Sequence, residues 1–220
     1  TYQVKISNEK GLVESSLAEV TVKQFSGYSI PVTRIKPLID GHQDGEWKNS
    51  PRIHLKNLIT GSRDNPKDLG GWFSAKWDSE NLYLFIRVFD DILSNKASID
   101  HLKDGIEVYL DLDNSKSPFY GDDEFQFRVV LDEDRVTSAI GSRVPNTQCA
   151  QSRLSDGYQI ELAIPWEGMG VSDTPGRFLG LDVHVNDNDG HTRDGKVAWW
   201  AKRDNSYQTP GVFGTVELEK

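Results

Sequence analysis

Apolar and polar residues alternate with a period of two along much of the chain from residue 72 onward. This period is typical of β-strands that turn one face to a core and the other to solvent. We find no long stretch with the 3.6-residue period of an amphipathic helix, so any helices should be short. The strand pattern occurs at 72–77, 82–89, 105–113, 124–131, 158–164, 179–186, 197–201 and 213–218. Short strands between turn signals predict an all-β fold, an antiparallel β-sandwich of jelly-roll-like type.

The two clearest strands, 105–113 and 124–131, also predict which side chains point away from the core. Alternate apolar residues fill the inner face of each strand, so Glu107 and Arg128 lie on the outer faces. His184 has the same parity within its own strand. A carboxylate, a guanidinium and an imidazole on one sheet face suit hydrogen bonding to vicinal hydroxyls. From the pattern alone, a solvated cross-strand ion pair is the favoured alternative.

Residues 1–27 predict a terminal hairpin. Residues 2–8 alternate, a turn signal follows at 8–11, and 18–22 alternate again. The segment resembles the last two strands of a fibronectin type III module, which implies that the chain was cut from a longer modular protein. The sandwich domain is then expected at 28–220, and a simple N-terminal hairpin of that domain is the alternative.

Charge and composition exclude several classes of partner. The chain has 25 Lys and Arg against 34 Asp and Glu, a formal net charge of −9, so a nucleic-acid partner is not expected. No run approaches the roughly 18 consecutive apolar residues of a transmembrane helix, so no membrane span is predicted. The single cysteine, Cys149, excludes an internal disulfide and a thiolate zinc cluster.

A series of short motifs runs from about residue 37 to the end of the chain. It includes Ile39-Asp40-Gly41, Trp77-Asp78, the run 104–111, Gln126-Phe127-Arg128, Val185-Asn186-Asp187, Trp200 and Phe213-Gly214. In order and spacing these motifs resemble a family 9 carbohydrate-binding module of the kind appended to bacterial xylanases. The resemblance implies a non-catalytic β-sandwich that binds carbohydrate and holds structural calcium. It also implies a secreted or cell-surface protein, attached to other modules of an enzyme that degrades polysaccharides such as xylan or cellulose.

The resemblance implies a sugar site at one end of the sandwich, where two tryptophans grip a terminal sugar and polar side chains bond its hydroxyls. The glutamate and the arginine of that site fall on Glu107 and Arg128, which match in type. A glutamine of the site falls on His184. The first tryptophan falls on Leu102 and the second on Tyr207. Leu102 has no aromatic face for stacking, so the ligand is expected to differ from the family's usual one, or the site to have decayed.

The predicted grip is therefore Tyr207 with help from Trp199. Strand alternation turns Trp199 to the face opposite its matched neighbour Trp200, which leaves it available to a ligand. A family asparagine falls near Asp204 and Asn205, and Asn205 is expected to bond the sugar. The expected ligand is a chain end or a small saccharide.

Three oxygen-rich loops are candidates for calcium, which takes six to eight hard oxygen ligands. They lie at 90–91, 111–123 and 186–189. The predicted metal ligands are Asp90, Asp111, Asp113, Asp122, Asp123 and Asp187. Hydrophilic turns, in which Asp and Asn bond their own backbone, are the alternative for each loop.

No motif for catalysis is present. The chain has neither a Gly-x-Ser-x-Gly elbow nor a glycine-rich phosphate loop, so this region is expected not to be an enzyme. One alternative function is a structural or protein-interaction sandwich that has lost sugar binding. A less favoured one is a haem-binding extracytoplasmic sandwich, which would need Met169, the only methionine, as an axial ligand. We expect no haem.

Overall fold

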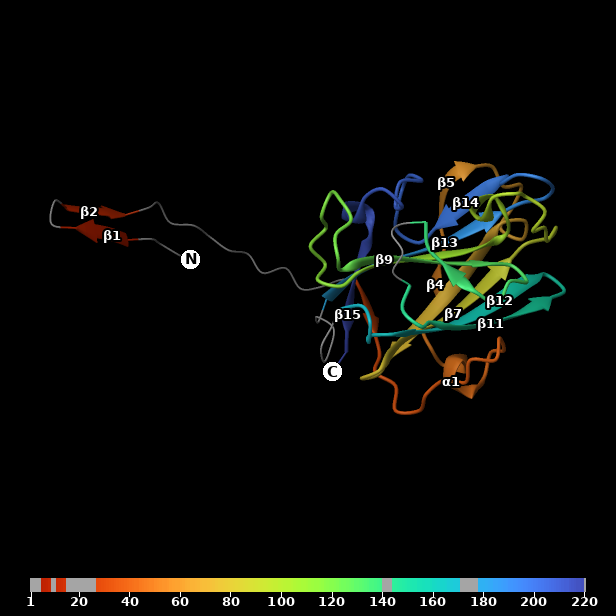
Figure 1. Ribbon diagram of the computed structural model, residues 1–220, viewed down its shortest axis with the longest axis horizontal. Coiled ribbons are helices and arrows are strands. Elements are labelled where there is room, and N and C mark those ends of the chain that lie inside the picture. Colours follow the sequence, from red (N-terminus) through yellow and green to blue (C-terminus); the bar gives the residue numbers. More distant parts are fainter. Residues whose placement is uncertain (1–4, 9–10, 15–26, 140–143, 171–177, 220) are drawn as a thin grey trace.

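The computed structural model describes residues 5–8, 11–14, 27–139, 144–170 and 178–219, and its main body is a sandwich of two sheets (Figure 1). The eight-stranded sheet contains β3 (Tyr28–Ile30), β5 (Asn57–Gly61), β8 (Gly105–Asp111), β9 (Glu124–Val130), β10 (Val136–Thr137), β13 (Phe178–Asp187), β14 (Gly195–Ala198) and β15 (Gly214–Leu218). The five-stranded sheet contains β4 (Ile53–His54), β6 (Gly70–Trp77), β7 (Asn81–Phe89), β11 (Gln148–Leu154) and β12 (Gly157–Pro165). The all-β sandwich prediction is confirmed.

Strand order places the most apolar strands at the centre of each sheet. The larger sheet runs β10-β9-β8-β13-β14-β5, with β15 paired to β13 and β3 paired to β15, and the smaller runs β11-β12-β7-β6-β4. Within the described ranges every strand pair is antiparallel except β3 with β15, which is parallel. The core lies between the sheets, where Val108 and Leu110 of β8 and Ile86 of β7 are fully buried. Each such side chain contributes about 1.5–3 kcal/mol by its burial, so a register slip of one residue is strongly disfavoured.

A second, smaller apolar cluster covers the outer face of the five-stranded sheet. Four of its five buried residues come from the strands of that sheet, and the fifth, Trp47, comes from α1 (Gly45–Lys48), which lies below the sheet in Figure 1. Trp47 of α1 is fully buried, and its ring lies 5.8 Å from that of Phe85, which in turn lies 5.4 Å from Trp72. Asp44 caps α1 by accepting a hydrogen bond from the Glu46 amide. In the described part of the chain no helix has the length and apolar composition needed to cross a bilayer.

Strands at sheet edges and strand ends differ from the sequence prediction. In the part of the chain that the structure describes, β11 pairs only with β12, and its mixed residues in Gln148–Leu154 give no clear alternation. β14 ends at Ala198 rather than at the predicted 201. The Asp182 carboxylate accepts hydrogen bonds from the amides of Trp200 and Ala201, at 3.0 and 2.8 Å, so these amides leave the sheet ladder.

The N-terminal hairpin forms a sheet of its own. β1 (Lys5–Asn8) pairs antiparallel with β2 (Gly11–Glu14), and Asn8 lies opposite Gly11, where the turn is predicted. Among the described residues neither strand pairs with the sandwich. Residues 2–4 and 18–22 of the predicted pattern lie outside the described residues.

Glu161→Gln tests how the α1 segment is attached. Glu161 is fully buried, and its carboxylate accepts hydrogen bonds from the amides of Asp40 and Gly41 and from Trp47 Nε1 at 2.7–3.0 Å. An amide group would set a donor against these donors, so we expect the free energy of unfolding to fall by about 2 kcal/mol. Urea unfolding measures it. Glu167→Gln, at an exposed position, is the control, and equal stability of the two variants would contradict this account.

Candidate ligand-binding cleft and metal sites

A cleft of about 290 Å³ opens on the outer face of the eight-stranded sheet. Its lining residues are His101, Glu107, Arg128, Ala139, Arg193, Lys196, Asp204 and Tyr207. The pairing of β8 with β9 sets Glu107 directly opposite Arg128, and both point away from the core, as predicted. Tyr207 reaches the same cleft from the loop after β14. The structure thus brings together three of the six residues predicted to bind carbohydrate.

The polar floor of the cleft is an alternating row of five charges. Arg128 Nε donates to Glu107 Oε1 at 2.9 Å, and Lys196 Nζ donates to Glu107 Oε2 at 2.5 Å. Lys196 Nζ also donates to Asp204 Oδ1 at 2.9 Å, and Arg193 Nη2 donates to Asp204 Oδ2 at 2.6 Å. Glu107 and Lys196 are each only 1% exposed. Each anion is held between two cations, so none of the five side chains is free to turn away.

These neighbours keep both carboxylates of the row ionised. Burial by itself would raise the pKa of Glu107, but Lys196 and Arg128 hold that pKa well below its usual range. Asp204 behaves in the same way: burial raises its pKa, and Lys196 and Arg193 outweigh the effect. The cleft therefore presents two charged acceptors at neutral pH, both fixed in position.

Two side chains with rings also line the cleft. Tyr207 is 45% exposed and lines the cleft. The second is His101, in the 3-10 helix η1 (Asp100–Leu102), whereas Leu102 is half-buried and does not line the cleft. Burial, and then the charge of Arg128, lower the pKa of His101, so its imidazole is neutral at neutral pH. The cleft lining therefore includes a neutral aromatic ring at the residue directly before Leu102.

His184 does not line the cleft, which corrects the expectation that it bonds a ligand directly. It is fully buried, its Nε2 lies 3.0 Å from Asp182 Oδ2 and 3.3 Å from Ser206 Oγ, and its ring centroid lies 4.8 Å from that of Tyr109. Ser206 covers His184 because the loop after β14 folds back over the sheet. His184 thus supports the loop that carries Tyr207.

The assignment of Trp199 to the ligand is also corrected. Trp199 packs into the core, where its ring lies 5.5 Å from that of Phe73, and Trp200 is the exposed member of the pair at 49%. The predicted alternation is right, but its direction is reversed. Trp199 continues the parity of Val197, which is fully buried in the core.

The late loop contributes Asp204 rather than Asn205, which is half-buried and lies outside the cleft lining. Sequence reasoning also missed His101, Lys196 and Arg193. Lys196 had a usable signal, because it alternates with apolar residues in a strand and so must leave the core. Arg193 and His101 lie in a loop and a short helical turn, where no periodicity shows which way a side chain points.

Among the described residues, three clusters of carboxylates could hold metal ions, each with ligand atoms within 4.8 Å of one another. The first is fully buried and consists of Asp90, Asp104 and Asp187. Burial raises the pKa of Asp90 and of Asp187 to about 8, and that of Asp104 to about 7. Asp90 Oδ2 and Asp187 Oδ1 are buried without a hydrogen-bond partner among the described residues. Buried oxygens of this kind fit a divalent cation with oxygen ligands.

The second cluster joins Asp111 and Asp123, both predicted, with Glu124. Burial raises the pKa of all three groups. Asp113 accepts a hydrogen bond from the Ser115 amide at 2.8 Å and belongs to no cluster among the described residues, nor does the exposed Asp122. The predicted loop is therefore the right one, but only two of its four proposed ligands converge.

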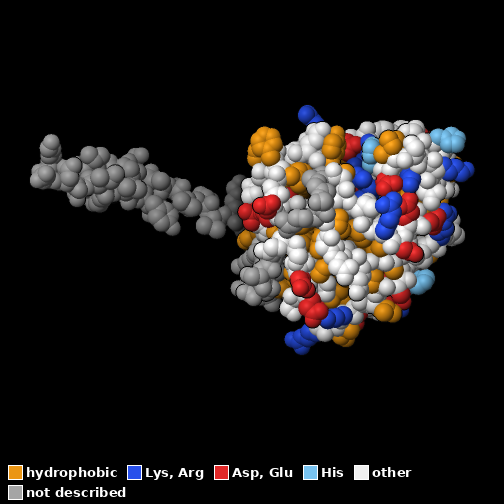
Figure 2. Space-filling view, in the orientation of Figure 1, with side chains coloured by type: hydrophobic (Ala, Val, Ile, Leu, Met, Phe, Trp, Pro, Cys, Tyr) orange, Lys and Arg blue, Asp and Glu red, His pale blue; other side chains and the backbone are white. Residues whose placement is uncertain are grey.

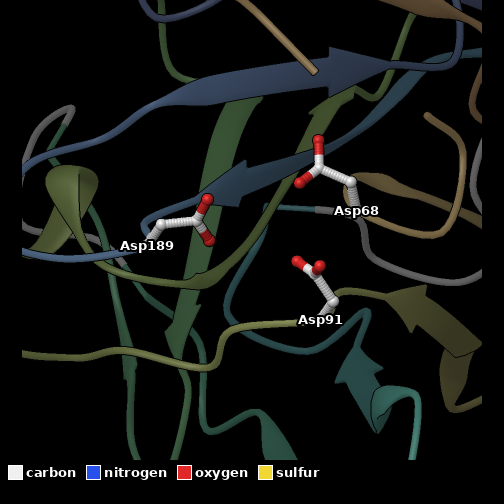
Figure 3. Close-up of side chains that lie close together, drawn as sticks. All are labelled: Asp68, Asp91 and Asp189. Carbon is white, nitrogen blue, oxygen red and sulfur yellow. The ribbon is translucent and has the colours of Figure 1, made fainter. Parts of the chain in front are cut away.

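The third cluster consists of Asp68, Asp91 and Asp189, whose carboxylates point toward a common centre from three separate loops (Figure 3). Asp91 directly follows Asp90, and Asp189 lies two residues after Asp187, which ends β13. The two clusters are thus adjacent, and burial followed by the charge of Asp68 raises the pKa of Asp189. Asp104 and Asp68 were missed because each stands outside the acidic loops of the sequence.

Paired substitutions test the reversed tryptophans. Trp199→Ala should leave a cavity in the core and lower the free energy of unfolding by about 3 kcal/mol. Trp200→Ala removes an exposed ring and should cost roughly 1 kcal/mol or less. Urea unfolding of both variants measures the difference, and a larger loss for Trp200→Ala would show that the packing described here is wrong.

The family described as carbohydrate family 9 binding domain-like matches residues 39–220. Endo-1,4-beta-xylanase A of Thermotoga neapolitana is 31% identical over 185 residues, which cover 84% of this chain and 17% of the xylanase. Endo-1,4-beta-xylanase C of Paenibacillus barcinonensis is 33% identical over 190 residues, 84% of this chain and 16% of that enzyme. The chain thus spans about a sixth of the length of these relatives.

Among solved structures, the fold is similar to a family 9 carbohydrate-binding module from Caldicellulosiruptor kristjanssonii in complex with cellotriose. The TM-score is 0.75 at 24% identity, over 87% of this chain and 93% of that one. A complex of a module from the same organism with glucose gives the same TM-score and identity. The resemblance seen in the sequence and the prediction of a binding module rather than an enzyme are confirmed. The match starts at residue 39 and does not bear on the hairpin of residues 1–27. This chain belongs to family 9 of the carbohydrate-binding modules.

Proposed function

We propose that the cleft binds the end of a polysaccharide chain or a small saccharide, without cleaving it. The observation that supports this most directly is that a fixed row of charges and the rings of His101 and Tyr207 line one cleft. The rings offer flat faces for the C–H side of a sugar, and the row offers donors and acceptors for its hydroxyls. The volume of about 290 Å³ is near the lower end of the roughly 300–1,000 Å³ of small-molecule pockets, which favours a chain end over a long polymer.

The internal pairing of the row suits a neutral ligand. A hydroxyl can donate to Glu107 or accept from Arg128 while each of these groups keeps its charged partner. Binding then leaves no buried charge without a partner. Desolvation of an unpaired charge would cost roughly several kcal/mol. The arrangement favours hydroxyl-rich molecules over apolar ones.

The parent protein is proposed to be a secreted enzyme that degrades polysaccharides such as xylan or cellulose. Its relatives are xylanases and an exoglucanase by name, and they are much longer than this chain. The module would hold the enzyme near its substrate. Residues 1–27 are proposed to end a preceding, fibronectin type III-like module, which is supported by the pairing of β1 and β2 with each other.

We also propose that the buried cluster of Asp90, Asp104 and Asp187 binds structural calcium. Three ionised carboxylates cannot share a buried space without a counterion, and calcium accepts hard oxygen ligands from loops. The adjacent Asp68, Asp91 and Asp189 would bind a second ion in the same way.

Tyr207→Ala tests the cleft. The variant should bind cello- or xylo-oligosaccharides about tenfold more weakly than the unaltered protein, because it loses a stacking face. Isothermal titration in calcium-containing buffer measures the affinity. Phe119→Ala removes a ring that is 76% exposed and does not line the cleft, so its affinity should be unchanged.

Two results would overturn the proposal. One is an unaltered protein that binds no glycan in a broad panel, which would favour the protein-interaction alternative. The other is a Tyr207→Ala variant that binds as the unaltered protein does.

Chelation tests the calcium proposal. In EDTA the raised pKa values of Asp90, Asp104 and Asp187 mean that the folded protein keeps protons which the unfolded chain releases. Their contribution to stability is therefore lost as the pH rises from about 4 to about 8. Calcium replaces these protons, so the increase in melting temperature on adding calcium should be larger at about pH 8 than at about pH 5.

Asp187→Asn should reduce this calcium-induced increase, whereas Asp134→Asn, at an exposed position, should preserve it. If the melting temperature is the same in calcium as in EDTA at both pH values, a structural ion is ruled out.

A further inference from the structure

The loop after β14 borders a second depression, of about 440 Å³, which shares no lining residue with the cleft. Its lining residues are Trp200, Ala201, Lys202, Arg203, Asn205 and Val212. The same loop carries Asp204 and Tyr207 to the cleft, so one loop serves both places. Two residues that do not line the cleft line this depression instead: the exposed Trp200 and Asn205, which was predicted to bind the sugar.

Trp200 is a flat platform whose position is fixed. Its backbone N–H donates to Asp182 Oδ1 at 3.0 Å, and its carbonyl accepts from Asn57 Nδ2 at 3.1 Å. Its ring lies 5.6 Å from that of Trp199, which is anchored in the core. Gly214 packs against it so closely that a Cβ there would come within 3.0 Å of Trp200 Cγ. A ring ordered in advance loses little entropy on binding.

The two charged side chains that line the depression are both positive. The Asp182 carboxylate, which accepts from the Trp200 and Ala201 amides, is fully buried and does not line it. Lys202 and Arg203 are exposed, and no carboxylate of the described residues lies within 4.0 Å of either as an ion-pair partner. Lys202 Nζ instead donates to the neutral Asn57 Oδ1 at 2.8 Å. Elsewhere charges are mixed: basic and acidic side chains lie next to one another at the right of the sandwich in Figure 2. On a chain of net charge −9, the depression therefore stands out because the charged groups of its lining are both cations.

We propose that this depression is a second carbohydrate site, which takes an acid-bearing sugar unit such as a uronate residue of a polysaccharide. The pyranose ring lies on Trp200, and the carboxylate lies between Lys202 and Arg203. A flat aromatic ring beside two cations matches a sugar with one apolar face and one negative charge. A polymer that reaches both this site and the cleft would be held more tightly than by either alone.

The test compares glucuronic-acid-substituted xylan with the same xylan after reduction of its carboxyl groups. The unaltered protein should bind the acidic polymer more tightly, and added salt should remove the difference. Trp200→Ala should bind the acidic xylan about tenfold more weakly. The double variant Lys202→Gln/Arg203→Gln should bind the two polymers equally. Lys48→Gln removes an exposed cation elsewhere and should have no effect.

The outcomes separate this site from the cleft. Glucose and cellobiose binding reports on the cleft alone and should be unchanged in Trp200→Ala, while Tyr207→Ala should keep part of its affinity for the acidic xylan. If Trp200→Ala unfolds, Trp200→Phe, which keeps a ring, should keep the binding.

The proposal is overturned if Trp200→Ala binds acidic xylan as well as the unaltered protein does. It is equally overturned if carboxyl reduction leaves the affinity unchanged, or if polyglutamate binds as tightly as the acidic xylan. Failure of the cleft would show instead as absence of glucose and cellobiose binding.

Discussion

The cleft depends on one constraint, which is that each strand of the larger sheet must give one face to the core. Val108 and Leu110 of β8 lie in the same core cluster as Ile86 of β7. Because successive side chains of a strand point to opposite faces, Glu107 points outward. Antiparallel pairing then sets it opposite Arg128 on one side and His184 on the other. A polar row thus follows from the burial of apolar residues, whose total contribution far exceeds that of any ion pair on the surface.

The buried charges complete what the alternation begins. Glu107 is almost fully buried, and an isolated carboxylate in that position would be neutral. Lys196 from β14 and Arg128 from β9 keep it ionised, and Asp204 and Arg193 extend the row into the loops. The row therefore links three strands, β8, β9 and β14, to the loops on either side of β14.

The sequence predicts the parts of this site that strands carry. Period-two alternation was enough to place Glu107 and Arg128 on one face, and it could have placed Lys196. The alternation failed where the direction of a side chain depends on the residue at which a strand ends. β14 ends because the Asp182 carboxylate accepts hydrogen bonds from the amides of Trp200 and Ala201. The residues next to the two tryptophans in sequence do not indicate that Trp199 packs into the core while Trp200 is exposed. His101 and Arg193 are set by tertiary contacts alone. The acidic loops were visible, but Asp104 and Asp68 join them only in three dimensions.

Asp182 holds the loop after β14 through backbone amides rather than through the side chains of Trp200 and Ala201. Every residue except proline has such an amide, so these two hydrogen bonds to Asp182 do not depend on which side chain is present at either position. Mutation can therefore exchange the ring of Trp200 for another group without releasing the loop. The attachment of the loop after β14 is therefore independent of which side chains that loop exposes. Related modules can thus diverge in ligand preference by single substitutions, with the path of the chain unchanged.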